Sequence, residues 1–386
     1  MAILAVACGI SALLLASGFI EWNLRYGRES TIHSELGHIR IFKPGYLLSG
    51  SAAPFDYLLD ADTKLEEAIL SAPHVELITP RLSFNGLASY GESTLSFIGE
   101  GVDPLKEERL SKSLTITSGQ SLSVEHPKGI IVGQGLAENL GIKPGDSMVL
   151  MVNSATGGVN AAEVTVLGLF ATITKAYDDA ALRVPISLAR QLIRVKGSHS
   201  YALLLDKTEN TSITLDGLET SFGKNGFEFV PWYDLADFYN KTAELFSRQV
   251  SVVRLIIAVI IVLSISNTLM MNVMERTGEI GTIMAIGVKR KEVLTQFLAE
   301  GLILGIAGGA LGLALAYALG AIISAIGIPM PAPPGMSFGY TAEILIKGQM
   351  AFEAYFLAII TTLVASVIPA IKASRMEIVN ALRHNR

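Results

Sequence analysis

The chain has 386 residues, of which 50% are hydrophobic and 17% are charged, and its mean hydropathy is +0.46. Soluble proteins of this length rarely combine these values, so the composition predicts an integral membrane protein. The formal net charge of −5, without any basic stripe, argues against nucleic-acid binding, and a single cysteine, Cys8, excludes an intrachain disulfide.

The first predicted element is a membrane span at residues 1–26. Met1–Ile20 is an almost uncharged apolar run, and Trp22 and Tyr26 follow it as an aromatic anchor. The run lacks the basic start and the clear small-residue cleavage site of a signal peptide. We therefore interpret it as an uncleaved transmembrane helix.

Residues 27–233 contain no apolar run long enough to cross a membrane. Short β-rich segments alternate with helical patterns, and Gly/Pro/Asp turns separate them. The pattern predicts a large extracytoplasmic α+β domain, which at roughly 200 residues can bury a core of its own. The predicted strands include 38–42, 95–99, 129–132, 147–152, 163–170 and 201–205, and the predicted helices are 63–70, 134–140, 188–194 and 211–223.

A long helix is predicted from the end of this domain through the second membrane span, over residues 234–274. Leu235, Phe238, Leu245 and Phe246 form a helical apolar face that runs into the span without an intervening Gly or Pro. At about 1.5 Å per residue this helix would be ~60 Å long, twice the thickness of the hydrocarbon core. It would protrude from the membrane as a stalk.

Residues 275–293 form a charged elbow between the second and third predicted spans. Ile280, Ile283 and Met284 recur at helical spacing, and Gly287 offers a helix stop. The charged residues of the elbow are Glu275, Arg276, Glu279, Lys289, Arg290, Lys291 and Glu292. An amphipathic helix between two spans is well suited to docking a cytoplasmic partner.

The third predicted span, residues 294–328, is rich in glycine. Gly301, Gly305, Gly308 and Gly312 form two GxxxG pairs, a spacing that lets helix backbones approach closely. The helix that packs against this face is either another span of the same chain or a span of a second copy.

Two polar residues, Asn267 and Glu300, are predicted at similar depth, ~10–14 Å beyond the elbow at about 1.5 Å per residue. In one interpretation they lie inside the membrane and hydrogen-bond one another. In the other, the third helix begins well below the membrane and Glu300 is only interfacial.

The last elements are a Pro/Gly-rich loop at residues 329–349, a fourth span at residues 350–371 and a tail at residues 372–386. The loop has a single basic residue, Lys347, whereas the elbow and the tail are basic. The basic residues of the tail are Lys372, Arg375, Arg383, His384 and Arg386. The positive-inside rule therefore places the elbow and the tail in the cytoplasm and the large domain outside.

The elbow and third span carry one long pattern, ERTGEIGTIMAIGVKRKEVLTQFLAEGLILGIAGGALG. It resembles the signature of the FtsX-like permease family of ABC transporters, which includes lipoprotein-release permeases and the permease portion of MacB-type efflux pumps. Weaker motifs extend the resemblance over nearly the whole chain, including GHIRIFKPGY (37–46), IIVGQGLAENLGIKPGD (130–146) and VPWYDL (230–235).

The resemblance implies a permease subunit of the bacterial inner membrane that pairs with a cytoplasmic ABC ATPase and with a second permease copy or paralogue. By analogy the outer domain has an inserted distal part near residues 125–195. In the family a short amphipathic segment precedes the first span, so here that segment is absent or the start is truncated. The residues expected to couple to the ATPase are Glu275, Arg276, Glu279, Ile280, Ile283, Met284 and Gly287.

No segment matches the phosphate-binding pattern GxxxxGK[ST] or the nucleophile pattern GxSxG, and the histidines lack metal-binding spacing. We predict no catalytic residue, cofactor or metal in this chain, with ATP and Mg²⁺ used by the partner ATPase.

The predicted function is to relay ATP-driven motion to the outer domain and so move a lipophilic or envelope substrate such as a lipoprotein. Membrane lipid and a periplasmic or envelope protein would be further partners. The alternatives are a drug, peptide or lipid exporter on the same scaffold, and a non-transporting regulator of a cell-wall hydrolase.

Overall fold

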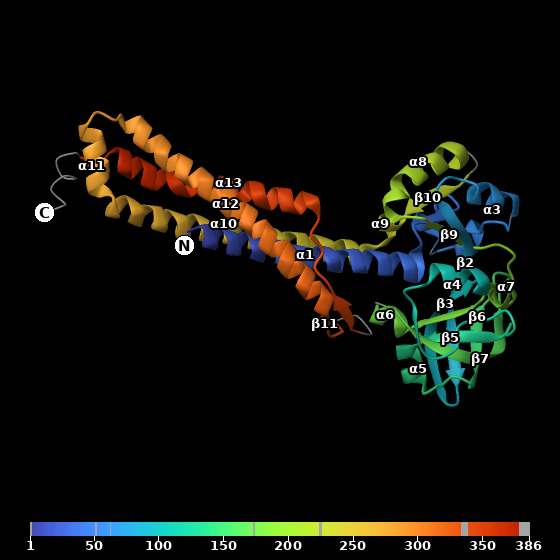
Figure 1. Cartoon of the computed structure of the whole chain (residues 1–386). Coiled ribbons are helices and arrows are strands. Elements are labelled where there is room, and N and C mark those ends of the chain that lie inside the picture. The colour runs from blue at the N-terminus through green and yellow to red at the C-terminus, as the bar shows by residue number, and fades with distance from the viewer. Residues whose placement is uncertain are drawn as a thin grey trace. The chain divides into compact units, whose positions relative to one another are not determined.

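The computed structural model describes residues 2–50, 52–61, 63–172, 174–223, 226–332 and 339–377 (Figure 1). The middle of the predicted 329–349 loop and most of the predicted tail, with Arg383, His384 and Arg386, lie outside these ranges. The chain divides into two compact units. The helical unit comprises Met1–Arg25, Thr242–Pro329 and Thr341–Arg386, and the mixed unit comprises Tyr26–Lys241 and Met330–Tyr340.

Among the described residues, four helices are long and apolar enough to cross a membrane, judged from length and composition. They are α1 (Ala2–Thr31), α10 (Asp237–Glu275), α12 (Arg290–Ile326) and α13 (Gly348–Ser374), and the short helix α11 (Thr277–Ala285) connects α10 to α12. This set confirms the four apolar helices predicted from the sequence.

The helical unit has its own apolar core. Its buried residues include Val6, Ile10 and Leu14 of α1, Ile261, Ile265 and Leu269 of α10, Ala316 of α12, and Ala354 and Ala358 of α13. Apart from this buried stripe, α10 exposes large apolar side chains such as Leu255 and Leu263, each 65% exposed. A helix that is apolar all round is typical of a membrane span.

In the described part of the mixed unit, ten strands form one sheet, in the order β10-β1-β9-β2-β3-β8-β5-β7-β4, and β6 pairs with both β2 and β7. The strands are β1 (Ile39–Phe42), β2 (Val75–Tyr90), β3 (Ser93–Val102), β4 (Thr115–Gly119), β5 (Gly129–Gly133), β6 (Ser147–Asn153), β7 (Val159–Ala171), β8 (Ala181–Pro185), β9 (Ser200–Leu205) and β10 (Glu228–Pro231). Because β6 joins β2 to β7, the strands β2, β3, β8, β5, β7 and β6 close into a ring, which removes free strand edges.

The long strand β2 is shared by two lobes. Its first part pairs with β9 as far as Arg81, and its second part pairs with β3 from Leu82 onward. The sheet lobe contains β10, β1, β9 and the first part of β2, with α3 (Thr63–Leu70) and α8 (Thr211–Phe222) contributing to its core. The barrel lobe contains the closed ring, with α5 (Gln134–Leu140) and α7 (Ile186–Ile193) contributing to its core.

The predicted insert near residues 125–195 falls inside the barrel lobe, whose core begins earlier, at Leu82. The physical reason is ring closure, because β2 and β3 are both members of the ring. The remaining short elements are a π-helix (Ile32–Leu36), α2 (Tyr46–Ser49), α4 (Pro104–Leu110), α6 (Lys175–Asp178), α9 (Trp232–Leu235), two 3-10 helices (Pro54–Tyr57 and Thr208–Asn210), β11 (Ile328–Met330) and β12 (Tyr340–Ala342).

Candidate functional site

The elbow is built as a short helix between two chain reversals. After α10 ends at Glu275, Arg276 leaves helical geometry with φ −99° and ψ 17°, and α11 begins at the next residue. After α11, Gly287 has a φ of +114°, which side chains of L residues rarely adopt. No atom lies within 4 Å of a Cβ added there, so the backbone conformation, rather than crowding, requires glycine at this turn.

Two of the predicted coupling residues lie in the chain's own core. Ile280 and Met284 are only 7% and 6% exposed. They belong to a cluster whose other buried members are Val273, Val293, Phe297, Ala370 and Ala373. The structure therefore corrects the prediction that Ile280 and Met284 are available to a partner. Residues four apart share one helix face, and α10, α12 and α13 already cover that face.

The other face of the elbow remains exposed and apolar. Ile283 is 41% exposed and Ile286 is 82% exposed. Helical spacing predicts Ile283 but not Ile286, whose only local signal is an apolar side chain next to the turn glycine. Exposed isoleucines beside charged side chains are a common composition for a docking surface.

The charged elbow residues lie at the surface. Glu275 is exposed, and Nε of Arg276 donates a hydrogen bond to Oε2 of Glu279 at 3.0 Å. Their side chains are 49% and 67% exposed. Such an ion pair contributes about 0–1 kcal/mol, so its charges serve partner selection more than stability.

The glycine face of α12 packs against other helices of the same unit. A Cβ added to Gly301 would lie 2.6 Å from Cβ of Ser366, and one added to Gly305 would lie 2.3 Å from Oγ1 of Thr362, both on α13. The second GxxxG pair faces α1, where Cβ atoms on Gly308 and Gly312 would lie 2.7 Å from Val6 and 2.9 Å from Ala7 and Ile10. These distances are too short for any side chain, so both pairs permit close packing within the chain.

The two polar residues predicted at similar depth are not joined. Asn267 is exposed on α10, and Glu300 is half-buried on α12. Glu300 lines a shallow hollow together with Gln296, Ala299 and Ile303. Over the ranges that the structure describes, no hydrogen bond connects Asn267 to Glu300, so the paired alternative is not the one observed.

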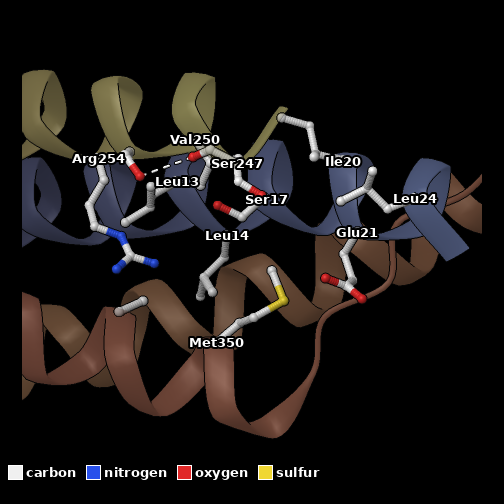
Figure 2. Close-up of a pocket in the computed structure, with 12 residues that line it drawn as sticks. Leu13, Leu14, Ser17, Ile20, Glu21, Leu24, Ser247, Val250, Arg254 and Met350 are labelled. Carbon is white, nitrogen blue, oxygen red and sulfur yellow. Dashed lines mark hydrogen bonds between the residues drawn. The ribbon is translucent and has the colours of Figure 1, made fainter. Parts of the chain in front are cut away.

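A groove of about 260 Å³ lies within the helical unit among α1, α10 and α13 (Figure 2). Its lining residues are Leu13, Leu14, Ser17, Ile20, Glu21, Leu24, Ser247, Val250, Ser251, Arg254, Met350 and Ala354. The walls are therefore mostly apolar, with three serine hydroxyls and two charged side chains among them. In the view of Figure 2, Arg254 and Glu21 lie toward opposite ends of the groove.

Each charged residue of the groove is paired with a residue of α13 or of the turn before it. Nη2 of Arg254 lies 3.1 Å from Oε2 of Glu353, and Lys347 forms an ion pair with Glu21. Along α10, Arg254 is about 30 Å from Glu275 at about 1.5 Å per residue, which equals the thickness of a hydrocarbon core. In a bilayer with the elbow at one surface, the groove would lie near the lipid headgroups of the other surface.

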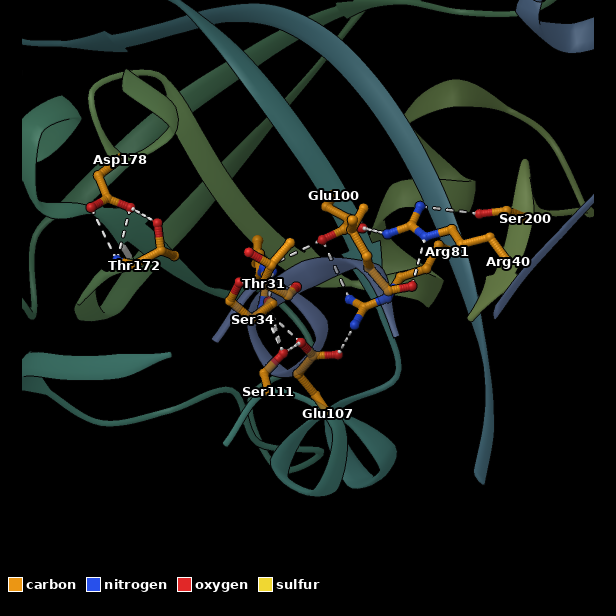
Figure 3. Close-up of polar contacts among 12 residues, drawn as sticks. Thr31, Ser34, Arg40, Arg81, Glu100, Glu107, Ser111, Thr172, Asp178 and Ser200 are labelled. Atoms are coloured by element: carbon orange, nitrogen blue, oxygen red, sulfur yellow. Dashed lines mark hydrogen bonds and ion pairs between the residues drawn. The ribbon is translucent and has the colours of Figure 1, made fainter. Parts of the chain in front are cut away.

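A second candidate site is a cluster of buried charges in the mixed unit (Figure 3). Nη2 of Arg81 lies 2.8 Å from Oε2 of Glu107, and Nη1 of Arg183 lies 2.7 Å from Oε1 of the same carboxylate. Glu100 contacts three guanidinium groups, at 3.3 Å from Arg183, 3.4 Å from Arg81 and 3.5 Å from Arg40. Burial acts to raise the pKa of Glu100, but the three guanidinium groups outweigh it and lower the pKa.

This charge cluster ties the end of α1 to both lobes. The π-helix Ile32–Leu36 follows α1, and Nη2 of Arg183 donates to the carbonyl oxygen of Ser34 at 2.7 Å. Nε of Arg40, on β1, donates to the carbonyl oxygen of Leu36 at 3.2 Å. Because Arg183 belongs to the barrel lobe and Arg40 to the sheet lobe, both lobes are attached to the segment that continues α1.

The charge cluster is not predicted by the sequence pattern. The available signal was a charged residue inside short β-rich segments, as in Arg40 of HIRIF, Glu100 of IGEGV and Arg183 of ALRVP. In an antiparallel sheet with one face in water such residues normally point to solvent, so the pattern did not indicate burial.

Two buried histidines, His38 and His199, make the stability of the mixed unit depend on pH. His38 accepts a hydrogen bond at Nδ1 from the backbone N–H of Leu205 at 3.1 Å, so its Nε2–H donates to Oγ1 of Thr208 at 3.1 Å. Burial, aided by His33, lowers the pKa of His38 to about 4, and burial lowers the pKa of His199 to about 4 as well. Between pH 6.5 and 4 the unfolded chain binds more protons than the folded chain. The free energy of unfolding therefore decreases as the pH falls through this window.

We expect the neutral variant His38→Gln to reduce this pH dependence. From pH 7 to pH 4.5, protonation of the unfolded histidine costs the original protein about 2–3 kcal/mol per buried histidine, and the variant lacks one such contribution. Thermal unfolding of the full chain at both pH values measures the difference. The exposed His126 supplies the matched control, because His126→Gln should leave the slope unchanged; equal slopes for both variants would contradict the assignment.

The chain matches two domain families. The MacB-like periplasmic core domain matches residues 1–220, and the FtsX-like permease C-terminal matches residues 251–378. The MacB periplasmic region from Actinobacillus actinomycetemcomitans, a solved structure, is 11% identical with a TM-score of 0.37, covering 53% of this chain and 93% of that chain.

Curated relatives are longer than this chain. The macrolide export ATP-binding/permease protein MacB of Shewanella sp. (strain ANA-3) is 23% identical over 326 residues, which cover 82% of this chain and 48% of the relative. The pyoverdine export ATP-binding/permease protein PvdT of Pseudomonas putida is 30% identical over 182 residues, which cover 46% of this chain and 25% of the relative. The chain thus spans about half the length of the curated relatives, or less.

The two domain families follow one another along the chain and leave few residues unmatched. The first of them covers more than half of the sequence, including α1 and both lobes as far as α8. The second covers the apolar helices α10, α12 and α13 together with the elbow. The chain belongs to the permease family that joins a MacB-like periplasmic core domain to an FtsX-like permease C-terminal.

Proposed function

We propose that this chain is the permease subunit of an ABC transporter and that it relays the motion of a separate cytoplasmic ATPase to an extracytoplasmic domain. The observation that carries the proposal is the elbow. Within the FtsX-like segment, α11 lies between two apolar helices, and Ile283 of α11 and Ile286 just after it are exposed. The sequence contains no phosphate-binding GxxxxGK[ST] motif, so the partner would hydrolyse ATP with Mg²⁺.

The two helices that lead into the mixed unit support a mechanical relay. α10 is a single helix of 39 residues that begins at Asp237 and ends at the elbow. α1 ends in the π-helix whose carbonyl groups are held by Arg183 and Arg40. Displacement of the elbow would pass along α10, while the charge cluster would make both lobes follow α1.

The substrate we favour is a lipophilic or envelope molecule such as a lipoprotein, moved without a hydrated channel. The apolar composition of the four helices supports this, because no chain of ionisable groups runs through them. The second candidate is a drug, peptide or lipid exporter on the same scaffold. The names of the macrolide and pyoverdine export relatives favour it.

The location we propose is the bacterial inner membrane, with a second permease copy or paralogue completing the transporter. The exposed Lys289, Arg290 and Lys291 support a cytoplasmic elbow by the positive-inside rule. The mixed unit would then lie outside the cytoplasm, where a periplasmic or envelope protein could contact it.

The test is binding and hydrolysis with the cognate ATPase. Reconstituted alone in nanodiscs, the chain should show no ATP hydrolysis above that of empty nanodiscs, and added ATPase should co-sediment with it. Hydrolysis by the chain alone, or an ATPase that does not bind, would contradict the proposal. A labelling control fixes the orientation: in a Cys8→Ser background, Lys143→Cys should react with an impermeant maleimide in intact spheroplasts, and Lys289→Cys should not.

A further inference from the structure

We propose that the groove among α1, α10 and α13 is a binding site for one membrane phospholipid with an ammonium headgroup, such as phosphatidylethanolamine. This inference concerns a resident lipid and does not depend on which substrate the transporter moves. Its support comes from hydrogen bonding, charge and depth in the membrane.

The groove contains hydroxyl groups that lack partners. Ser251 donates its hydroxyl to the carbonyl oxygen of Ser247 at 3.0 Å (Figure 2). Over the described ranges, the hydroxyls of Ser17 and Ser247 take part in no hydrogen bond, although both residues line the groove. Ser247 is exposed and Ser17 is half-buried, so both hydroxyls are free to donate to a molecule in the groove. The phosphate and ester oxygens of a lipid are acceptors for both hydroxyls.

The charges around the groove favour a zwitterion over an anion. Arg254 and Lys347 are the two bases, Glu21 and Glu353 are the two acids, and each base is paired with one acid. Their sum is zero, so an anionic lipid gains no net attraction, whereas a lipid with separated charges can place its phosphate near Arg254 and its ammonium toward Glu21. Both side chains line the groove, and both are partly exposed and open to such contacts.

The depth of the groove matches the headgroup region. Arg254 lies about one hydrocarbon thickness from the elbow along α10. Beside it α10 exposes Leu255, which is 65% exposed, and Val259, which is 49% exposed, a surface for acyl chains. Bilayer lipid is present at very high local concentration, so by mass action even a modest preference would keep the site occupied.

The experiment measures lipid retained by the full chain. The protein is extracted from nanodiscs that contain equal amounts of phosphatidylethanolamine and phosphatidylglycerol, washed with mild detergent and examined by native mass spectrometry. We expect about one phosphatidylethanolamine per chain and several-fold less phosphatidylglycerol. Ser17→Phe fills the groove without touching either ion pair, and should reduce the retained lipid about tenfold, the loss expected when roughly 1.4 kcal/mol of binding free energy disappears.

Two further variants separate the parts of the argument. Ala16→Phe places the same ring on the exposed face of α1, outside the groove, and should retain lipid like the original chain. Glu21→Gln removes the carboxylate that would face the ammonium and should equalise the two lipids. Equal retention of both lipids by the original chain, undiminished lipid in Ser17→Phe, or displacement of the phospholipid by an equimolar diacylated peptide would each overturn the proposal. None of these outcomes bears on whether the elbow binds an ATPase.

Discussion

Replacing Ile286 with aspartate is expected to weaken assembly with the proposed ATPase strongly while the chain remains folded and inserted. Ile286 is 82% exposed, so the substitution removes almost no contact within the chain. In a desolvated interface, loss of such an anchor costs about 2 kcal/mol or more, which corresponds to roughly a 30-fold weaker complex. A buried carboxylate adds a further penalty. Co-purification of the ATPase and transport-dependent growth measure the effect, and Ile283→Asp should act in the same direction.

Two controls separate docking from folding. Ile326→Asp changes a residue of matching exposure, 80%, at the far end of α12 and should leave assembly intact. Met284→Asp places a charge in the elbow's own core and should lower the yield and the thermal stability of the chain itself. Should Ile283→Asp and Ile286→Asp both assemble and support growth at the original level, the elbow is only a connector.

Replacing Glu107 with glutamine, which neutralises one of the two carboxylates of the charge cluster, is expected to destabilise the chain strongly. The cluster holds three guanidinium groups and two carboxylates, so it already has an excess of positive charge. Glu107→Gln leaves Arg81 and Arg183 buried with the single carboxylate of Glu100. Breaking a buried ion pair in this way costs about 3–5 kcal/mol, because an uncompensated charge remains in the interior.

Replacing an arginine of the cluster should cost less stability than replacing Glu107. Arg40 reaches Glu100 only at 3.5 Å, and Arg40→Met reduces the excess positive charge, so its cost should be less than half that of Glu107→Gln. Denaturant unfolding of the full chain in a Trp22→Phe background, followed by the fluorescence of Trp232 in the mixed unit, measures both. Lys175→Met changes a pair at the surface and should stay within about 0.5 kcal/mol of the original protein. If Arg40→Met lowered the free energy of unfolding as much as Glu107→Gln or more, charge balance would not govern the stability of the cluster.

Local signals made much of the secondary structure predictable. The predicted helix at residues 134–140 coincides with α5, and that at residues 211–223 differs from α8 by one residue. In both segments apolar residues recur at helical spacing. The long apolar helices were predictable for a similar reason, since composition alone distinguishes them from the rest of the chain.

The closed ring was not predictable from local patterns. It depends on β6 pairing with β2, and these strands are separated by more than 50 residues along the chain. The predicted insert near residues 125–195 therefore covers the ring strands β5 to β8 but not β2 and β3. The same limit applies to the elbow. Helical spacing identifies Ile280, Ile283 and Met284 as a set, but the tertiary packing decides which of them face α12 and α13.

The pairing of β1 imposes an order on the synthesis of this protein. β1, which follows α1 closely, has β9 and β10 as its two neighbours, and both come from residues 200–231. While the ribosome is still producing the barrel lobe, the four residues Ile39–Phe42 therefore have no strand to pair with. The sheet lobe is completed only when residue 231 has been synthesised, just before α10 begins. The nascent chain thus carries an unpaired strand until residues 200–231 have been synthesised, a period when a chaperone would have access to it.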